Sequence, residues 1–147
     1  MFINNKISVF FFVFLALALG GLSSADTAND VWYQTLNKSS LNPPGFVFGI
    51  VWPILYFLMS VSAYRTFPHT RNLFLFQLFF NGIWSWIFFA FHLPLLALLN
   101  IWLLIGINIK LNIHFYRLDK LSGILFIPYI IWLFFASYLN LFIVINN

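Results

Sequence analysis

The sequence predicts an all-α membrane protein, a single domain of residues 1–147 built as a five-transmembrane-helix bundle. Of its residues, 63% are hydrophobic and only 7% are charged, whereas about a quarter of the residues are charged in an ordinary soluble domain. The hydrophobic residues form continuous runs, while a lipid-facing barrel would show segments of about ten residues with alternating character. Composition and pattern together therefore indicate helices that cross a membrane.

Apolar segments account for most of the chain. A helix needs about 17 to 25 residues to cross a hydrocarbon core of roughly 30 Å, and the expected helices are residues 7–22, 44–64, 73–91, 93–113 and 121–145. The long connection between the first two, residues 23–42, is expected to be an outer loop. The first segment is the shortest and ends in "GGLSSAD", which is also typical of a cleavable signal peptide, so its retention and its removal both stay open.

The basic residues predict the orientation of the bundle. With five spans, all but one of the lysines and arginines fall on one side of the membrane: Lys6, Arg65, Arg71, Lys110, Arg117 and Lys120. Only Lys38 falls on the other side. Because basic residues are enriched on the cytoplasmic side, we expect the N-terminus inside and the C-terminus outside. The net charge of +4 is explained by this asymmetry and indicates no nucleic-acid partner.

Aromatic and polar residues recur three or four positions apart inside the spans, which places them on shared helix faces. These faces hold Trp52 and Tyr56 in the second segment, Gln77, Asn81, Trp84 and Phe88 in the third, and Pro128, Trp132, Ala136 and Asn140 in the fifth. Three helices thus each place an indole at a similar depth in the outer half of the membrane, which predicts a cavity. The same indoles could instead pack against neighbouring helices, and the Asn81 amide could hydrogen-bond across helices, since an unsatisfied amide in lipid costs several kcal/mol.

The small residues Gly45 and Gly49 are four positions apart at the start of the second segment. Such spacing is typical of helices whose backbones approach one another closely. We therefore expect these glycines to lie at a helix contact.

Three blocks of the sequence together resemble the TspO/MBR family. The first is "WYQTLNKSSLNPPGFVFGIVWPILYFLMS", the second "QLFFNGIWSWIFF" and the third "PYIIWLFFASYLN". The matching positions extend from Trp32 to Asn140. Two departures stand out: Ser39 follows Lys38 where the family usually has proline, and no lysine or arginine follows Tyr138, which makes cholesterol a doubtful ligand. The short chain without a basic tail resembles a bacterial member of the family.

The resemblance implies a five-helix bundle, generally a homodimer, that binds flat hydrophobic ligands. These include protoporphyrin IX, haem, sterols and benzodiazepine-type drugs, with no cofactor required, and membrane lipid is a further expected partner. By motif, Trp52, Asn81, Trp132 and Ala136 would line the pocket, with Tyr33 and Lys38 near its mouth. The full expected ligand-binding set is Tyr33, Lys38, Trp52, Tyr56, Asn81, Trp84, Phe88, Trp132, Ala136 and Leu139. The expected location is a bacterial inner membrane, crossed several times.

Several functions stay open on the sequence alone. The acidic residues Asp26, Asp30 and Asp119 all fall in loops, so no carboxylate pair inside the membrane indicates an enzyme. Resemblance to the family suggests light-driven porphyrin degradation with Trp52 and Trp132 in a photochemical role. Uncoupled transport of a lipid or porphyrin, and regulation through a bound ligand in a stress response, are the alternatives. Lys38 would pair with a porphyrin propionate or remain a solvated loop lysine.

Overall fold

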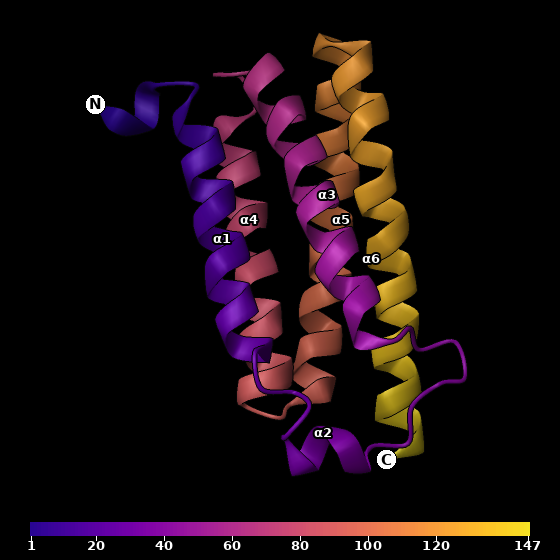
Figure 1. The fold of residues 1–147 in the computed structure, drawn as a ribbon. Coiled ribbons are helices and arrows are strands. Elements are labelled where there is room, and N and C mark those ends of the chain that lie inside the picture. The colour runs from indigo at the N-terminus through magenta and orange to yellow at the C-terminus, as the bar shows by residue number, and fades with distance from the viewer.

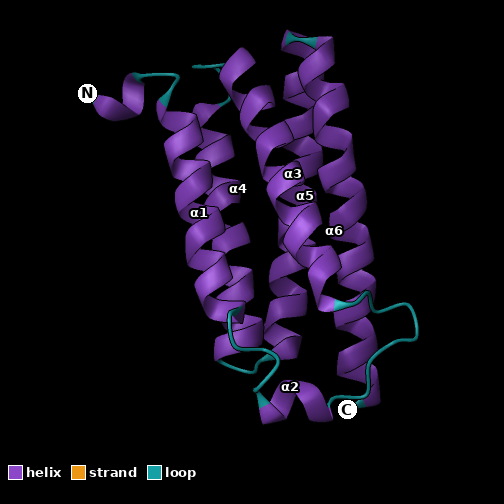
Figure 2. Ribbon diagram, viewed as in Figure 1, coloured by secondary structure: helices purple, strands orange, loops and turns teal.

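The structure is a computed structural model that describes residues 1–147, and every regular element in it is a helix (Figure 2). The elements are η1 (Phe2–Asn4), α1 (Ser8–Ser24), α2 (Val31–Thr35), α3 (Gly45–Arg65), α4 (Arg71–Ser85), η2 (Trp86–Ala90), α5 (Pro94–Leu118) and α6 (Lys120–Asn146). The prediction of an all-α protein is therefore confirmed.

The long helices form a closed ring in which each packs chiefly on two neighbours. The order around the ring is α1, α4, α5, α6 and α3, with α3 returning to α1 (Figure 1). This order differs from the order in the chain, because α3 packs on α1 and α6 and not chiefly on α4, which follows it. The ring interior is filled by side chains from different helices, including Met59, Phe74, Leu104 and Leu133, all at most 1% exposed.

Four of the helices are long and apolar enough to cross a membrane: α3, α4 with its continuation to Ala90, α5 and α6. Helix α1, with 17 residues, is apolar but shorter. It lies against α3 and α4 and buries Val9 and Val13 there. The structure thus contains four candidate spans and one shorter apolar helix, while the orientation relative to the membrane stays a prediction.

The two ends of the bundle differ in their connections. One end, here called the basic end, carries the α3–α4 connection (residues 66–70) and Asp119 between α5 and α6, at the top of Figure 1. The other, here called the loop end, carries the outer loop and the α4–α5 connection, at the bottom of Figure 1. The outer loop also contains the short helix α2, which was not predicted. Asp30 caps the start of α2, because its carboxylate accepts a hydrogen bond from the Trp32 N–H.

The third predicted helix does not continue regularly to residue 91. After Ser85 it widens into the π-helical turn η2, in which the Phe91 N–H donates to the Trp86 carbonyl at 2.9 Å. Helix α5 extends to Leu118, beyond the predicted end at residue 113. Hydropathy alone indicates neither change, because the π-helical turn is as apolar as the helix before it, whereas the extension of α5 contains His114 and Arg117.

The expected close packing at Gly45 and Gly49 is wrong within this chain. Both residues are exposed, and a Cβ added to either would have no atom within 4 Å. The close approach occurs instead at Gly123 on α6, where an added Cβ would lie 2.7 Å from the Tyr116 Cβ and 2.8 Å from the Tyr116 Cα on α5. The absence of a side chain at Gly123 therefore allows the α5–α6 hairpin to close.

Replacing Gly123 by alanine should destabilise the bundle. The added methyl group would force the backbone of Tyr116 away, and such overpacking typically costs about 1 to 3 kcal/mol. Thermal unfolding in detergent should show a lower Tm for Gly123→Ala. The matched control is Gly49→Ala, which should keep or raise the Tm, because alanine is the better helix former by about 1 kcal/mol. Equal Tm values for the two variants would contradict the close approach.

Asp119 joins three helices at the basic end. Its carboxylate accepts hydrogen bonds from Arg65 at the end of α3, at 2.6 and 3.2 Å. It also caps α6 by accepting from the Ser122 N–H at 3.2 Å and from the Ser122 hydroxyl at 2.5 Å. The hydrogen bonds from Arg65 and then Ser122 hold the pKa of Asp119 well below its ordinary value of 3.8. The carboxylate is therefore more stable in the folded protein than in the unfolded chain.

This lowered pKa predicts a pH dependence for Asp119→Asn. A carboxylate with a lowered folded pKa contributes stability above its unfolded pKa, and the contribution disappears as the pH falls through the folded pKa. The wild-type protein should therefore have the higher Tm at pH 7, and the difference should shrink once the pH drops below about 4. A Tm difference that stays constant down to the lowest accessible pH would contradict this role.

Candidate ligand site inside the bundle

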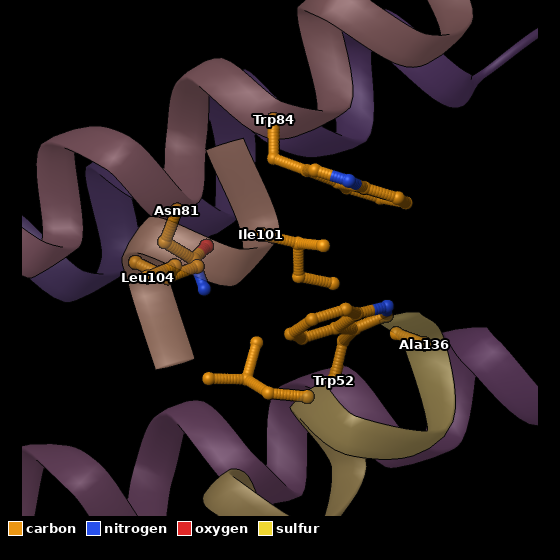
Figure 3. A pocket seen from close by; sticks show the side chains of 7 residues that line it. Trp52, Asn81, Trp84, Ile101, Leu104 and Ala136 are labelled. Atoms are coloured by element: carbon orange, nitrogen blue, oxygen red, sulfur yellow. The ribbon is translucent and has the colours of Figure 1, made fainter. Parts of the chain in front are cut away.

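A small cavity lies inside the ring between α3, α4, α5 and α6 (Figure 3). The indoles of Trp52 and Trp84 lie on opposite sides of it. The other lining residues are Asn81, Ile101, Leu104, Leu133 and Ala136. Its volume is about 10 Å³, which is room for one water molecule at most. A larger ligand can therefore enter only if the surrounding side chains or helices move apart.

The floor of the cavity is a hydrogen-bonded network centred on Asn81. The Asn81 amide oxygen accepts from the Tyr56 hydroxyl on α3, and its amide nitrogen donates to the Tyr129 hydroxyl on α6. The Tyr129 hydroxyl in turn donates to the Gln77 side-chain oxygen at 3.3 Å. All four residues are at most 6% exposed. Asn81 thus makes the cross-helix hydrogen bonds that the sequence left open, and Tyr56 points at α4.

Trp132 packs behind Trp52. The two indoles meet edge to face with 6.1 Å between ring centroids and 86° between their planes. Phe48 contacts Trp132 from the loop end of α3, with centroids 5.8 Å apart. The Trp132 Nε1 is buried and has no hydrogen-bond partner, whereas the Trp84 Nε1 donates to Asn140 at 3.2 Å. Trp132 therefore carries a buried N–H group without a partner, on an indole that contacts Trp52 of the cavity wall.

A chain of aromatic contacts connects the cavity with the outer loop. Trp84 stacks on Phe88 of the π-helical turn, with centroids 5.4 Å apart and planes 19° apart. Phe88 meets Trp32 of α2 edge to face at 5.7 Å, and Tyr33 at 6.5 Å. π-Helical turns occur frequently at functional sites. Here the turn places Phe88 between the cavity and the loop.

The outer loop is fastened to the end of α6. The Asn37 N–H donates to the Asn147 side chain at 2.8 Å, and the Asn147 amide nitrogen donates to the Asn37 carbonyl at 3.1 Å. The hydroxyls of Ser39 and Tyr138 are hydrogen-bonded at 2.9 Å. Since these contacts lie beyond the indoles, the loop closes this end of the bundle.

Lys38 lies on the outer loop with its Nζ 4.5 Å from the centroid of the Tyr33 ring. This is a cation–π contact, and no carboxylate pairs with the ammonium group. Burial raises the pKa of the Tyr33 hydroxyl. Neither Lys38 nor Tyr33 lines the cavity. Both residues belong to the outer loop that closes this end of the bundle.

A second contact fastens the loop to the connection between η2 and α5. The His92 Nε2 is 3.0 Å from the Asp30 carboxylate, and the imidazole stacks on the Trp32 indole with centroids 4.2 Å apart and planes 16° apart. The backbone of His92 has φ 55°, a conformation uncommon for residues other than glycine. This role of His92 was not predicted, because nothing in the local sequence pattern pairs it with Asp30.

The structure brings most of the predicted site residues to one region. Trp52, Asn81, Trp84 and Ala136 line the cavity, and Trp132 and Tyr56 adjoin it. Phe88 and the buried Leu139 lie further toward the loop end. The prediction missed Leu133 of α6, and Ile101 and Leu104 of α5, which also line the cavity. Their helical spacing was visible, but in a helix that is apolar on all sides it does not distinguish the inner face.

Comparisons with known proteins show the family of the chain. The profile of the TspO/MBR family matches residues 9–145. The chain belongs to the TspO/MBR family. It is 33% identical to protein CrtK of Rhodobacter capsulatus, with 92% of this chain and 90% of that protein covered. It is 37% identical to the tryptophan-rich sensory protein of Cereibacter sphaeroides, with 76% of this chain and 73% of that protein covered. It is 31% identical to the human translocator protein, with 74% of this chain and 70% of that protein covered. Its apolar helices and its membership of the TspO/MBR family make it an integral, multi-pass membrane protein.

Replacing His92 by alanine should loosen the outer loop without unfolding this TspO/MBR protein. The change removes the hydrogen-bond partner of the Asp30 carboxylate and the ring stacked on Trp32, two contacts that together are worth about 1 kcal/mol. Hydrogen–deuterium exchange should then become about fivefold faster for amides of residues 31–39. The control is His69→Ala, a change to an exposed histidine at the basic end, which should leave exchange in the loop unchanged. Equal exchange in the loop of both variants would show that His92 does not hold it.

Proposed function

We propose that the protein binds a flat hydrophobic ligand, with tetrapyrroles such as protoporphyrin IX or haem first among the candidates, inside the ring of helices. The observation that carries this proposal is the placement of Trp52 and Trp84 on opposite sides of one cavity beneath the outer loop. A tetrapyrrole offers a large aromatic face to such indoles, and each aromatic pair contributes about 0.5 to 1.5 kcal/mol beyond its area burial.

The ligand requires an opening, and the contacts around the cavity indicate on which side it forms. The floor is the buried network of Tyr56, Asn81 and Tyr129, and breaking it in a membrane would cost several kcal/mol. The loop is held mainly by exposed or half-buried contacts, those of Asn37 with Asn147 and of Ser39 with Tyr138. The site therefore opens toward the loop end, with the network as its fixed base.

Two polar groups near the opening suit the edge of a tetrapyrrole. The free N–H group of Trp132 can donate to an acceptor on the ligand. Lys38 is the basic residue of the outer loop, has no carboxylate partner, and can pair with a propionate. Sterols and benzodiazepine-type drugs, which carry no propionate, would use the indoles alone.

A titration of the detergent-solubilised protein with protoporphyrin IX tests the proposal through quenching of tryptophan fluorescence. Quenching should saturate near one ligand per chain. Trp132→Phe should weaken the affinity roughly threefold to tenfold, because it removes both the N–H group and part of the aromatic surface.

The matched control is Trp102→Phe. Trp102 lies on α5 outside the cavity, is 48% exposed, and donates its Nε1 hydrogen to Ser137 at 2.8 Å. This variant also loses one indole but should bind protoporphyrin IX with unchanged affinity. Linear quenching with the same slope in all proteins would show that the indoles only pack here.

The biological consequence of ligand binding is also a proposal. The names of two relatives, translocator protein and tryptophan-rich sensory protein, suggest transport or regulation, and a stress response is consistent with either. The edge-to-face contact of Trp52 with Trp132 favours the alternative of light-driven porphyrin degradation, since a porphyrin beside Trp52 would have both indoles near it. A homodimer and a bacterial inner membrane remain the expected assembly and location.

A further inference from the structure

A second and larger cavity lies at the basic end, between the start of α4 and the last third of α5. Its volume is about 250 Å³. Its walls are polar, formed by His69, Thr70, Asn72, Lys110 and His114, and its apolar sides are Leu73 and Leu111. We call it the α4–α5 crevice. It is separate from the ligand site, since the two cavities share no lining residue.

The α4–α5 crevice carries positive charge without a matching acid. Its lining contains no aspartate or glutamate. The acid at this end, Asp119, already pairs with Arg65 at 2.6 Å. Lys110 is exposed and pairs with no carboxylate. The crevice is therefore a place where an anion gains an attraction that the protein itself does not use.

The hydrogen bonds near the α4–α5 crevice also leave donors free. Arg71 donates to the Asn72 side-chain oxygen at 3.1 Å and to Asn4 at 2.6 Å. The Asn72 amide nitrogen is thus available as a donor. The His114 Nδ1 donates to the Lys110 carbonyl at 2.8 Å, so its Nε2 is an acceptor in the neutral imidazole and a donor to an anion only in the protonated imidazolium. These groups and the Lys110 ammonium suit an anion with several acceptor oxygens.

We propose that the α4–α5 crevice binds a phosphate group. A phosphate carries several strong acceptor oxygens and forms charge-assisted hydrogen bonds with lysine and with protonated histidine. Basic pockets between membrane helices on the cytoplasmic side are a recognised setting for lipid headgroups. Leu73 and Leu111 add apolar surface to the crevice, which suits the glycerol and acyl carbons of an anionic lipid. A phosphate on a small soluble compound shares the same chemistry.

The proposal is tested on the full-length protein in detergent with two probes. Native mass spectrometry compares the binding of phosphatidic acid and of phosphatidylcholine with the same acyl chains. In parallel, NMR of the histidine side chains follows a titration with inorganic phosphate. Tighter binding of phosphatidic acid identifies a lipid, whereas shifts of His69 and His114 with inorganic phosphate alone identify a soluble source.

The decisive comparison is Lys110→Gln against Lys120→Gln. Both changes remove one positive charge at the basic end, but Lys120 lies outside the crevice. Lys110→Gln should weaken phosphatidic acid or phosphate binding about fivefold, the factor that one basic residue near an anionic surface provides. Lys120→Gln should change it less than about twofold. No binding of either probe would overturn the proposal. Equal losses of affinity in the two variants would also overturn it, because they would indicate a diffuse electrostatic attraction to the basic end.

Discussion

The structure depends on one buried side chain, Asn81, whose amide is held between two tyrosine hydroxyls. Between membrane helices the hydrophobic effect supplies little attraction, because lipid tails are as apolar as the side chains. A buried amide, in contrast, must find partners, and Tyr56 and Tyr129 supply them from α3 and α6. The requirement therefore selects which faces of α3 and α6 turn toward α4. Once these faces are fixed, Trp52, Trp84 and Trp132 are placed about one turn closer to the loop end.

The network lies between two ends of the bundle that are closed in different ways. Toward the basic end the helices are joined by direct contacts: the Ser62 hydroxyl donates to the Ser122 carbonyl at 2.9 Å, Gly123 lies against Tyr116, and Asp119 pairs with Arg65. Toward the loop end the helices are also joined directly, for example where the Asn140 amide nitrogen donates to the Pro94 carbonyl at 2.8 Å, but the contacts that hold the outer loop over this end are largely exposed. Ligand-binding loops are drawn from the less stable parts of a structure. Under the proposed function, the outer loop over the cavity is therefore the part that moves to admit the ligand.

The sequence predicted the helices and the core of the site because their signals are local. Trp52 and Tyr56 share a face by spacing alone, and so do Asn81 with Trp84 and Trp132 with Ala136. The order of helices around the ring could not be predicted. Helices that are apolar on all sides have no distinct buried face, so their sequences do not indicate which helix packs against which. Gly45 and Gly49 matched a packing pattern but pack on nothing within the chain, while Gly123, in no such pattern, makes the close approach. The contact of His92 with Asp30 joins distant positions and leaves no local signal.

Buried polar atoms without a hydrogen-bond partner bear on which ligands the site would prefer. Three buried polar atoms lack a hydrogen-bond partner: the side-chain oxygens of Asn108 and Asn112 on α5, and the Trp132 Nε1. The Trp132 indole packs against Trp52, which lines the cavity. A buried donor without a partner costs about 1 to 3 kcal/mol, and the fold carries this cost at Trp132. A ligand that brings an acceptor to Trp132 removes this cost in addition to stacking on the indoles. The proposed site should therefore bind a flat ligand with a hydrogen-bond acceptor near one edge more tightly than a hydrocarbon of equal area.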